Sequence, residues 1–140
     1  MAQLKTLFLV DDDEDDRFLI RDAVESIIDN LNIIEFDNGI DFLENIRQRD
    51  ITLGSVLVLL DINMPRLGGL EVISSLRSDP GNKTLPILAI STASNPELIK
   101  EIYNTGANGY FTKPDSLQGI NQLAKDIKHY LMEDPSKPLV

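Results

Sequence analysis

The sequence predicts an α/β domain, a doubly wound sheet of five parallel strands with helices on both faces. Along the 140 residues, five short apolar runs alternate with five longer stretches whose apolar residues recur at helical spacing. No sequence repeat or low-complexity linker interrupts this order. Repeated strand–helix units favour a parallel sheet whose strands are joined by right-handed crossovers.

The expected strands are short, apolar and bounded by turn residues. The third, SVLVLL, is the most continuous apolar run, as expected for a central strand that is covered on both faces. The second, NIIEF, stops at the turn residues of the segment DNG. The five strands are expected at residues 4–10, 32–36, 55–60, 85–91 and 109–112.

Five helices are expected between and after these strands. Phe18, Ile20 and Val24 mark the first at helical spacing, and Leu117 and Ile120 open the apolar face of the last. The segment NPE opens the fourth, because it combines a capping residue, a proline in the first turn and an acid near the positive helix end. The helices are expected at about residues 14–31, 40–49, 70–78, 95–106 and 115–131, and the segment DPG stops the third.

One domain accounts for the chain. Residues 1–132 are expected to form it, and the proline-rich residues 133–140 to form a short, flexible tail. A chain of this length with 42% hydrophobic residues can bury a core without disulfides. The absence of cysteine excludes disulfides, thiolate catalysis and Cys-based metal sites. The single histidine, His129, cannot form a His-rich metal site and is expected to be incidental.

The chain is acidic, with a net charge of −10 and a pI of about 4.4. An acidic protein is repelled by phosphate backbones and anionic lipids, so neither nucleic acid nor a membrane is expected as a partner. The N-terminus lacks the long apolar stretch of a signal peptide, and no window approaches the roughly 20 apolar residues that cross a bilayer. These features favour a cytoplasmic location.

Polar residues directly follow or end four of the expected strands. Asp11 and Asp12 follow the first, Asp61 follows the third, Ser91 ends the fourth and Lys113 follows the fifth. Ligands of open parallel sheets bind at the carboxyl ends of the strands, so these side chains are expected to converge. Carboxylates with a hydroxyl and a lysine, without sulfur or histidine, suit Mg²⁺ and phosphoryl chemistry.

Asp61 is the natural nucleophile of such a site, because it follows the central strand between the acid pair and the hydroxyl. Its carboxylate could attack a phosphoryl group and form an aspartyl phosphate. Mg²⁺ and Lys113 would stabilise the phosphoryl oxygens as charge shifts. An acid directly after so apolar a run is costly unless it is used, which argues against a merely structural Asp61.

Four segments resemble, in order and spacing, the signature blocks of response-regulator receiver domains of two-component signalling. They are LVDDD, LVLLDINMPRLGGLEV, LPILAIST and GANGYFTKP. The resemblance covers about residues 4–131 and implies the flavodoxin-like fold of a single-domain receiver. Three details depart from the family pattern. Serine stands at position 91, where threonine is commoner. Asp115 follows Pro114 where phenylalanine is common, and extra length is expected around the second helix and the ITLGS turn.

The resemblance implies a Mg²⁺ site beside a phospho-acceptor. Asp61 matches the phospho-acceptor and a metal ligand. Asp12 matches a direct metal ligand, and Asp11 matches an acid that acts through water. Asn63 matches the position whose backbone carbonyl contacts the metal.

The remaining acids of the run DDDEDD have a plainer interpretation. Asp13 is expected to cap the first helix rather than to ligate a metal. Glu14, Asp15 and Asp16 are expected to form the solvated start of that helix, where the helix dipole favours negative charge.

The resemblance also implies residues that respond to the phosphoryl group. Ser91 matches the switch hydroxyl and is preferred to Thr92 because of its distance before Lys113. Lys113 matches the lysine that contacts the phosphoryl group, and Tyr110 matches the aromatic residue that turns inward on activation. A cis peptide bond between Lys113 and Pro114 is implied as well. The supporting positions are Thr92, Ala93 and Pro114.

The function that the resemblance implies is a signalling switch. A sensor histidine kinase, such as a bacterial phytochrome, would donate its phosphoryl group to Asp61, and Ser91 and Tyr110 would then shift. The face made by the fourth helix, the fifth strand and the fifth helix would change shape. Output would pass to a downstream protein partner, a phosphotransfer protein or a homodimer. The chain would catalyse only its own phosphorylation and dephosphorylation, so it is not expected to be an enzyme.

Two other functions stay open. A Mg²⁺-dependent phosphatase of the haloacid-dehalogenase kind also uses an Asp nucleophile, but it normally needs a second Asp two residues later, where this chain has Asn63. A receiver-like adaptor would bind partners without phosphorylation. The complete set of pocket residues argues against the adaptor.

Overall fold

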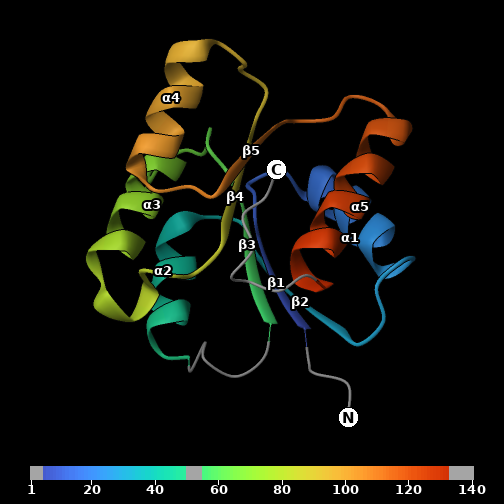
Figure 1. Ribbon diagram of the computed structural model, residues 1–140, viewed down its shortest axis with the longest axis horizontal. Coiled ribbons are helices and arrows are strands. Elements are labelled where there is room, and N and C mark those ends of the chain that lie inside the picture. The colour runs from blue at the N-terminus through green and yellow to red at the C-terminus, as the bar shows by residue number, and fades with distance from the viewer. Residues whose placement is uncertain (1–4, 50–54, 133–140) are drawn as a thin grey trace.

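The computed structural model describes residues 5–49 and 55–132 and confirms the α/β fold class (Figure 1). Five parallel strands form one sheet in the order β2-β1-β3-β4-β5. The chain winds in opposite directions from β1, which creates a switch point at the carboxyl ends of β1 and β3. The strands are β1 (Lys5–Val10), β2 (Leu31–Phe36), β3 (Ser55–Asp61), β4 (Ile87–Ser91) and β5 (Gly109–Thr112).

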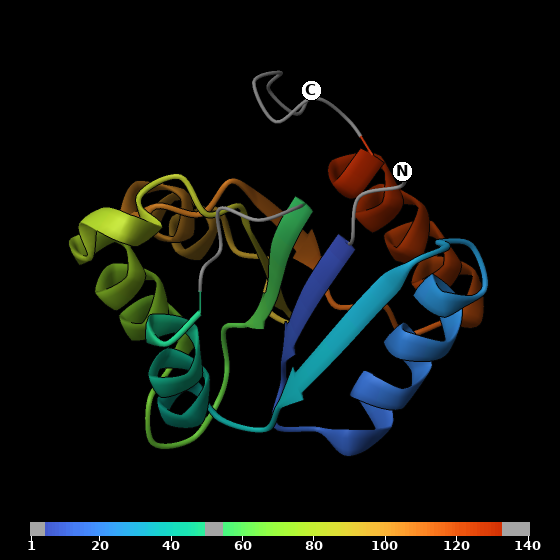
Figure 2. The ribbon, with the colours of Figure 1, turned by 90° about the horizontal axis from the view of Figure 1, so that it is seen from below.

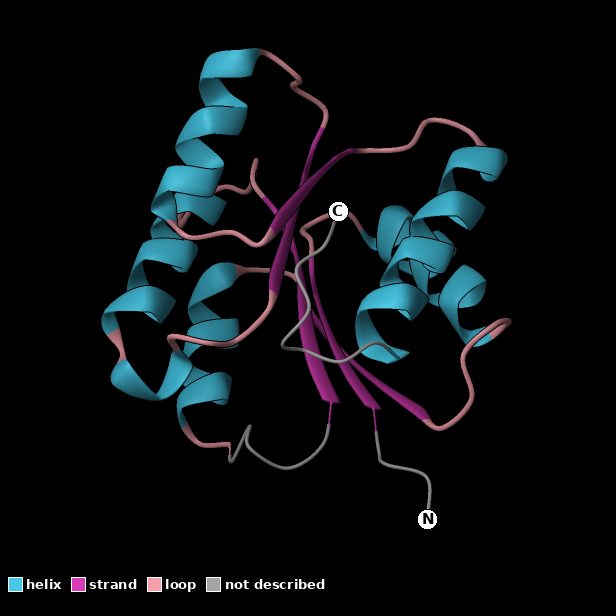
Figure 3. Ribbon diagram, in the orientation of Figure 1, coloured by secondary structure: helices cyan, strands magenta, loops and turns pink. Residues whose placement is uncertain are grey.

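Helices cover both faces of the sheet, with α1 and α5 on one face and α2, α3 and α4 on the other (Figures 2 and 3). A short 3₁₀ helix, Pro80–Asn82, follows α3. Within the described residues, no helix is long and apolar enough to cross a membrane. The α-helices are α1 (Glu14–Glu25), α2 (Gly39–Arg47), α3 (Gly69–Ser78), α4 (Pro96–Thr105) and α5 (Leu117–Met132).

Each face of the sheet has its own apolar core. Side chains alternate along a strand, so Phe8 and Val10 of β1 join the core beneath α2, α3 and α4. Leu7 and Leu9 of the same strand join the core beneath α1 and α5. This burial on both sides explains why the central strands carry apolar side chains on both of their faces. Full burial of one such side chain stabilises the fold by about 1.5–3 kcal/mol.

The first helix is shorter than the sequence predicts. α1 ends at Glu25, and Leu31 already belongs to β2. The connecting residues form turns, and Asn30 has a left-handed φ of 57°. Ile28 packs against the core from within this connection, although it is not helical. Because Ile28 is apolar at helical spacing, the sequence predicts a longer helix than the structure has.

Two apolar side chains that mark the first and last predicted helices are exposed. Phe18 of α1 is 56% exposed, and the guanidinium carbon of Arg21 lies 5.8 Å from the centroid of its ring. Leu117 is 68% exposed, because it is the first residue of α5 and the buried stripe begins one turn later at Ile120. Helical spacing therefore indicates both helices, but it does not tell where a helix loses contact with the sheet.

The predicted cis bond between Lys113 and Pro114 is also wrong, because the described residues contain no cis peptide bond. A peptide bond before proline still prefers the trans form by about 0.5–1 kcal/mol. Two other expectations fall on residues outside the described ranges. They are the extra length at the ITLGS turn, most of which belongs to residues 50–54, and the tail at residues 133–140.

Gly106 ends α4 in a conformation that favours glycine. Its φ is 130°, and a Cβ would lie 2.7 Å from Cγ of Arg77, whose Nε donates a hydrogen bond to the Gly106 carbonyl oxygen. We expect Gly106→Ala to lower the free energy of unfolding by about 1–3 kcal/mol in urea denaturation. Gly81→Ala is the matched control, because a Cβ there meets its nearest atom at 3.5 Å. An equal loss in both variants would contradict the prediction.

Candidate functional site

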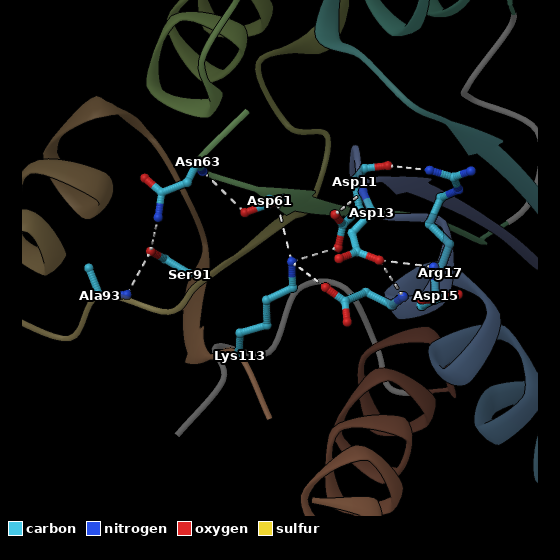
Figure 4. Close-up of polar contacts among 10 residues, drawn as sticks. Asp11, Asp13, Asp15, Arg17, Asp61, Asn63, Ser91, Ala93 and Lys113 are labelled. Carbon is cyan, nitrogen blue, oxygen red and sulfur yellow. Dashed lines mark hydrogen bonds and ion pairs between the residues drawn. The ribbon is translucent and has the colours of Figure 1, made fainter. Parts of the chain in front are cut away.

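Four strands end at one edge of the sheet and bring the predicted site residues together (Figure 4). Asp11 follows β1, Asp61 and Ser91 are the last residues of β3 and β4, and Lys113 follows β5. The main-chain nitrogen of Lys113 donates a hydrogen bond to the Ser91 carbonyl oxygen at 2.8 Å, so the strand ladder continues to the site. The side chain of Lys113 lies between Asp61 and the acids that follow β1 (Figure 4).

Three carboxylates converge at this edge. One oxygen from each of Asp11, Asp12 and Asp61 lies within 4.8 Å of the others. Asp11 and Asp61 are buried, whereas Asp12 is exposed. Oδ2 of Asp11 is buried and accepts no hydrogen bond from the described residues, although Nζ of Lys113 lies 3.0 Å away as an ion pair. Clustered carboxylate oxygens with such a buried acceptor fit a hard divalent cation such as Mg²⁺.

Burial raises the pKa of Asp61 to about 7. The negative charge of Asp11 adds to this effect, because it disfavours a second charge nearby. The ammonium of Lys113 acts in the opposite direction, as does the hydrogen bond that the main-chain nitrogen of Asn63 donates to Oδ1 of Asp61 at 3.1 Å. The Asp61 carboxyl is therefore poised to respond to any cation that enters the site.

Lys113 keeps its charge despite being mostly buried. Burial acts to lower its pKa, but the contacts with Asp16 and Asp11 and the charge of Asp61 raise the pKa overall. Nζ lies 2.7 Å from Oδ2 of Asp16, 3.0 Å from Oδ2 of Asp11 and 3.4 Å from Oδ2 of Asp61. Interpreting Asp16 as part of a merely solvated helix start was therefore wrong. The position of Asp16 in the first helical turn after a strand end is the sequence signal that could have revealed its contact with Lys113.

Asp13 caps α1, as predicted. Its Oδ1 accepts hydrogen bonds from the main-chain nitrogens of Asp15 at 2.9 Å and Asp16 at 3.2 Å. The main-chain nitrogen of Asp13 in turn donates to Oδ1 of Asp11 at 2.9 Å. These bonds link the first turn of α1 to the acid that follows β1.

An ion-pair network of Arg17, Arg21 and Glu35 lies beside the main chain of Asp11. The sequence did not predict it. Nη1 of Arg17 donates a hydrogen bond to the main-chain oxygen of Asp11 at 2.6 Å. Nε of the same guanidinium pairs with Oε1 of Glu35 in β2 at 3.1 Å, and Arg21 pairs with the other oxygen of Glu35. The network therefore fixes the backbone of the acid pair. Arginines four residues apart on a helix, with an acid on the neighbouring strand, are the signal that could have revealed it.

Ser91 is the buried hydroxyl of the site, whereas Thr92 is exposed. Oγ of Ser91 accepts hydrogen bonds from Nδ2 of Asn63 at 3.0 Å and from the main-chain nitrogen of Ala93 at 3.1 Å. The side chain of Asn63 thus bridges the loops after β3 and β4, a contact that the sequence did not predict. The hydroxyl of half-buried Tyr110 donates to the main-chain oxygen of Ala93, so this ring points toward the same loop.

Gly69, the first residue of α3, and Pro114 lie next to residues of the site. A Cβ on Gly69 would lie 2.6 Å from Cα of Ile62 and 2.8 Å from the main-chain oxygen of Asp61. A side chain at position 69 would therefore displace the segment that carries Asp61. Pro114 lies beside Asp16 and Lys113 in the lining of a small cavity.

The raised pKa of Asp61 predicts how stability depends on pH. The unfolded chain releases the Asp61 proton near pH 3.8, whereas the folded chain holds it until about pH 7, so unfolding releases a proton between these values and rising pH destabilises the fold. Asp61→Asn removes this effect. We expect the stability advantage of Asp61→Asn over the wild type, measured by urea denaturation in EDTA, to grow from about pH 5 to about pH 7 and then to level off.

Asp22→Asn on α1 is the control for this measurement, because it makes the same chemical change at an exposed position. A stability difference between Asp61→Asn and the wild type that is the same at about pH 5 and about pH 8 would contradict the prediction.

Similarity to known proteins in sequence and fold identifies the family. The chain matches the response regulator receiver domain over residues 7–125. It is 27% identical over 137 residues to the response regulator Rcp1 of Synechocystis sp.. The aligned residues cover 96% of this chain and 93% of Rcp1. A crystal structure of the phosphorylated cyanobacterial phytochrome response regulator RcpA is similar at 30% identity, with a TM-score of 0.81 and coverage of 93% of this chain and 95% of RcpA. The Mn²⁺-bound form of Rcp1 shares the fold, with a TM-score of 0.81 at 23% identity over 96% of this chain and 99% of that structure. The chain belongs to the response regulator receiver domain family.

Proposed function

We propose that this receiver domain is a phosphorylation-activated switch of a two-component system whose phospho-acceptor is Asp61. The observation that carries the proposal is the position of the Asp61 carboxylate. One of its oxygens lies within 4.8 Å of oxygens of Asp11 and Asp12, and its Oδ2 lies 3.4 Å from Nζ of Lys113. A carboxylate at the centre of a divalent-metal donor set, with an ammonium beside it, is suited to accept a phosphoryl group.

In the proposed reaction, a carboxylate oxygen of Asp61 attacks the phosphorus of a kinase phosphohistidine. A phosphorus–oxygen bond forms as the phosphorus–nitrogen bond breaks, and the released imidazole nitrogen keeps the electron pair and takes up a proton. Lys113 balances the negative charge that the phosphoryl group brings. Hydrolysis by water then returns Asp61 to a carboxylate and releases inorganic phosphate, so the chain acts only on itself.

Receiver domains bind divalent metal, and we propose Mg²⁺ as the ion in this chain. Asp12 and Asp61 would hold it directly, Asp11 through water and Asn63 through its backbone carbonyl. When bound, Mg²⁺ supplies Lewis-acid stabilisation to the phosphoryl oxygens. The cluster of three carboxylates supports this assignment, as does the Mn²⁺-bound form of Rcp1.

Ser91, Tyr110 and Lys113 are proposed to convey the change at Asp61. Oγ of Ser91 already accepts two hydrogen bonds, which leaves the hydroxyl hydrogen to donate toward a phosphoryl oxygen. If the Ser91 side chain moved toward this phosphoryl oxygen, it would pull on the loop at Ala93. Thr92 and Pro114 would support the loops on either side. Because the Tyr110 hydroxyl donates to the Ala93 carbonyl oxygen, the change would reach the surface of α4, β5 and α5.

The proposed phosphoryl donor is a sensor histidine kinase, and a bacterial phytochrome is the specific candidate. The support is the similarity to RcpA, a cyanobacterial phytochrome response regulator, at 30% identity over 93% of this chain. Output would pass through the α4–β5–α5 surface to a downstream protein, to a phosphotransfer protein or to a second copy of the chain. A phosphatase of the haloacid-dehalogenase kind gains no support, because Asn63 donates its amide to Ser91 and has no acid group to offer a leaving group.

Phosphoryl uptake tests the proposal. With acetyl phosphate or phosphoramidate and Mg²⁺, intact mass should show one added phosphoryl group on the wild type and none on Asp61→Asn, which lacks the nucleophilic carboxylate. EDTA should abolish uptake by the wild type. Asp22→Asn serves as the control and should be labelled like the wild type, because Asp22 is exposed on α1. Label on Asp61→Asn would refute the assignment of the acceptor.

The switch is tested by removing one hydroxyl. Ser91→Ala should still accept a phosphoryl group, because Asp61, the metal-holding acids and Lys113 are unchanged. The NMR shift changes that phosphorylation causes at amides of α4, β5 and α5 should fall to a minor fraction of those in the wild type. Ser94→Ala, at an exposed position in the same loop, should respond like the wild type. Wild-type shift changes in Ser91→Ala would contradict the proposed route.

A further inference from the structure

Asp16 is the acid that lies closest to the ammonium of Lys113. Its Oδ2 is 2.7 Å from Nζ, compared with 3.0 Å for Asp11 and 3.4 Å for Asp61. The side chain of Asp16 is 34% exposed and that of Lys113 is 13% exposed, so the pair lies at the rim of the site. The proposed phosphorylation chemistry uses Asp11, Asp61 and Lys113, and it gives Asp16 no task.

The contact joins α1 to the segment after β5. Asp16 and Lys113 both line a small cavity, together with apolar residues of α1 and α5 and with Pro114. The backbone of Asp16 is held in place, because its main-chain nitrogen donates to the capping carboxylate of Asp13 at 3.2 Å. The carboxylate of Asp16 therefore reaches Lys113 from a fixed helical turn.

We propose that Asp16 is a positioning residue that competes with a phosphoryl group on Asp61 for Lys113. The inference rests on the proposed function, because it concerns the same acceptor. Nζ lies closer to Asp16 than to Asp61, so a turn of the ammonium toward a phosphoryl group on Asp61 stretches the contact with Asp16. The Asp16 carboxylate thus disfavours the phosphorylated form relative to the free carboxylate.

Asp15 offers a matched control for this role. It occupies the same helical turn, carries the same charge and is exposed, and its neighbour Asp16 makes the ion pair with Lys113. Asp15→Asn and Asp16→Asn therefore remove the same charge from the same region. Any effect that only Asp16→Asn shows comes from the contact with Lys113 and not from the general acidity of the turn.

Beryllofluoride, a mimic of the phosphoryl group, measures the competition. Its affinity for the full chain at saturating Mg²⁺ is measured by calorimetry, because the chain has no tryptophan to report binding. We expect Asp16→Asn to bind beryllofluoride about three- to fivefold more tightly than Asp15→Asn, the range of a partly exposed ion pair. An affinity of Asp16→Asn equal to or weaker than that of Asp15→Asn would overturn the proposal.

A double-mutant cycle separates this inference from the proposed function. Urea denaturation without any phosphoryl mimic compares Asp16→Asn and Asp15→Asn, each alone and combined with Lys113→Met. The Asp16 cycle should show coupling with Lys113 that the Asp15 cycle lacks, and equal coupling in both cycles overturns the inference alone. A wild type that binds no beryllofluoride and takes no phosphoryl group overturns the proposed function and the competition together.

Discussion

The contact of one ammonium with three carboxylates is the interaction on which the site depends. Asp11 and Asp61 are both almost completely buried, and two carboxylates placed so close favour protonation of one of them. Nζ of Lys113 lies within ion-pair distance of both and of Asp16, which offsets this repulsion. The sheet edge can therefore hold an acidic pocket, in which the proposed metal ion or phosphoryl group would change the balance of charge.

The arrangement of the sheet could be predicted from the sequence because its strands have only one way to bury their side chains. The run VLVLL of β3 is apolar at every position, since helices cover both faces of this strand. The ends of helices could not be predicted as well. Ile28 is apolar at helical spacing although it lies in the non-helical connection after α1, and Leu117 is exposed although it begins an apolar pattern. Burial at such positions depends on the length and tilt of the helix, which the local pattern does not contain.

The same distinction applies to the site. Residues at strand ends could be predicted to converge, because parallel strands bring their carboxyl ends to one edge. The contacts of Asp16, Arg17 and the Asn63 side chain could not, since they depend on how α1 is rotated and on which rotamers the side chains adopt. The roles proposed for Asp61, Ser91 and Tyr110 come from the match to a family pattern, and the geometry supplies the contacts through which those roles would be exercised.

The acidic run at the start of α1 resembles a uniform patch of charge, yet its members have separate contacts. Asp11 and Asp16 pair with Lys113, Asp12 belongs to the carboxylate cluster and Asp13 caps the helix. Glu14 and Asp15 are exposed in the first turn of α1. Natural variation among descendants of this chain would therefore be uneven within six residues, with drift at the fourth and fifth positions and retention at the others. Selection would act on the position of each acid and not on the total charge of the run.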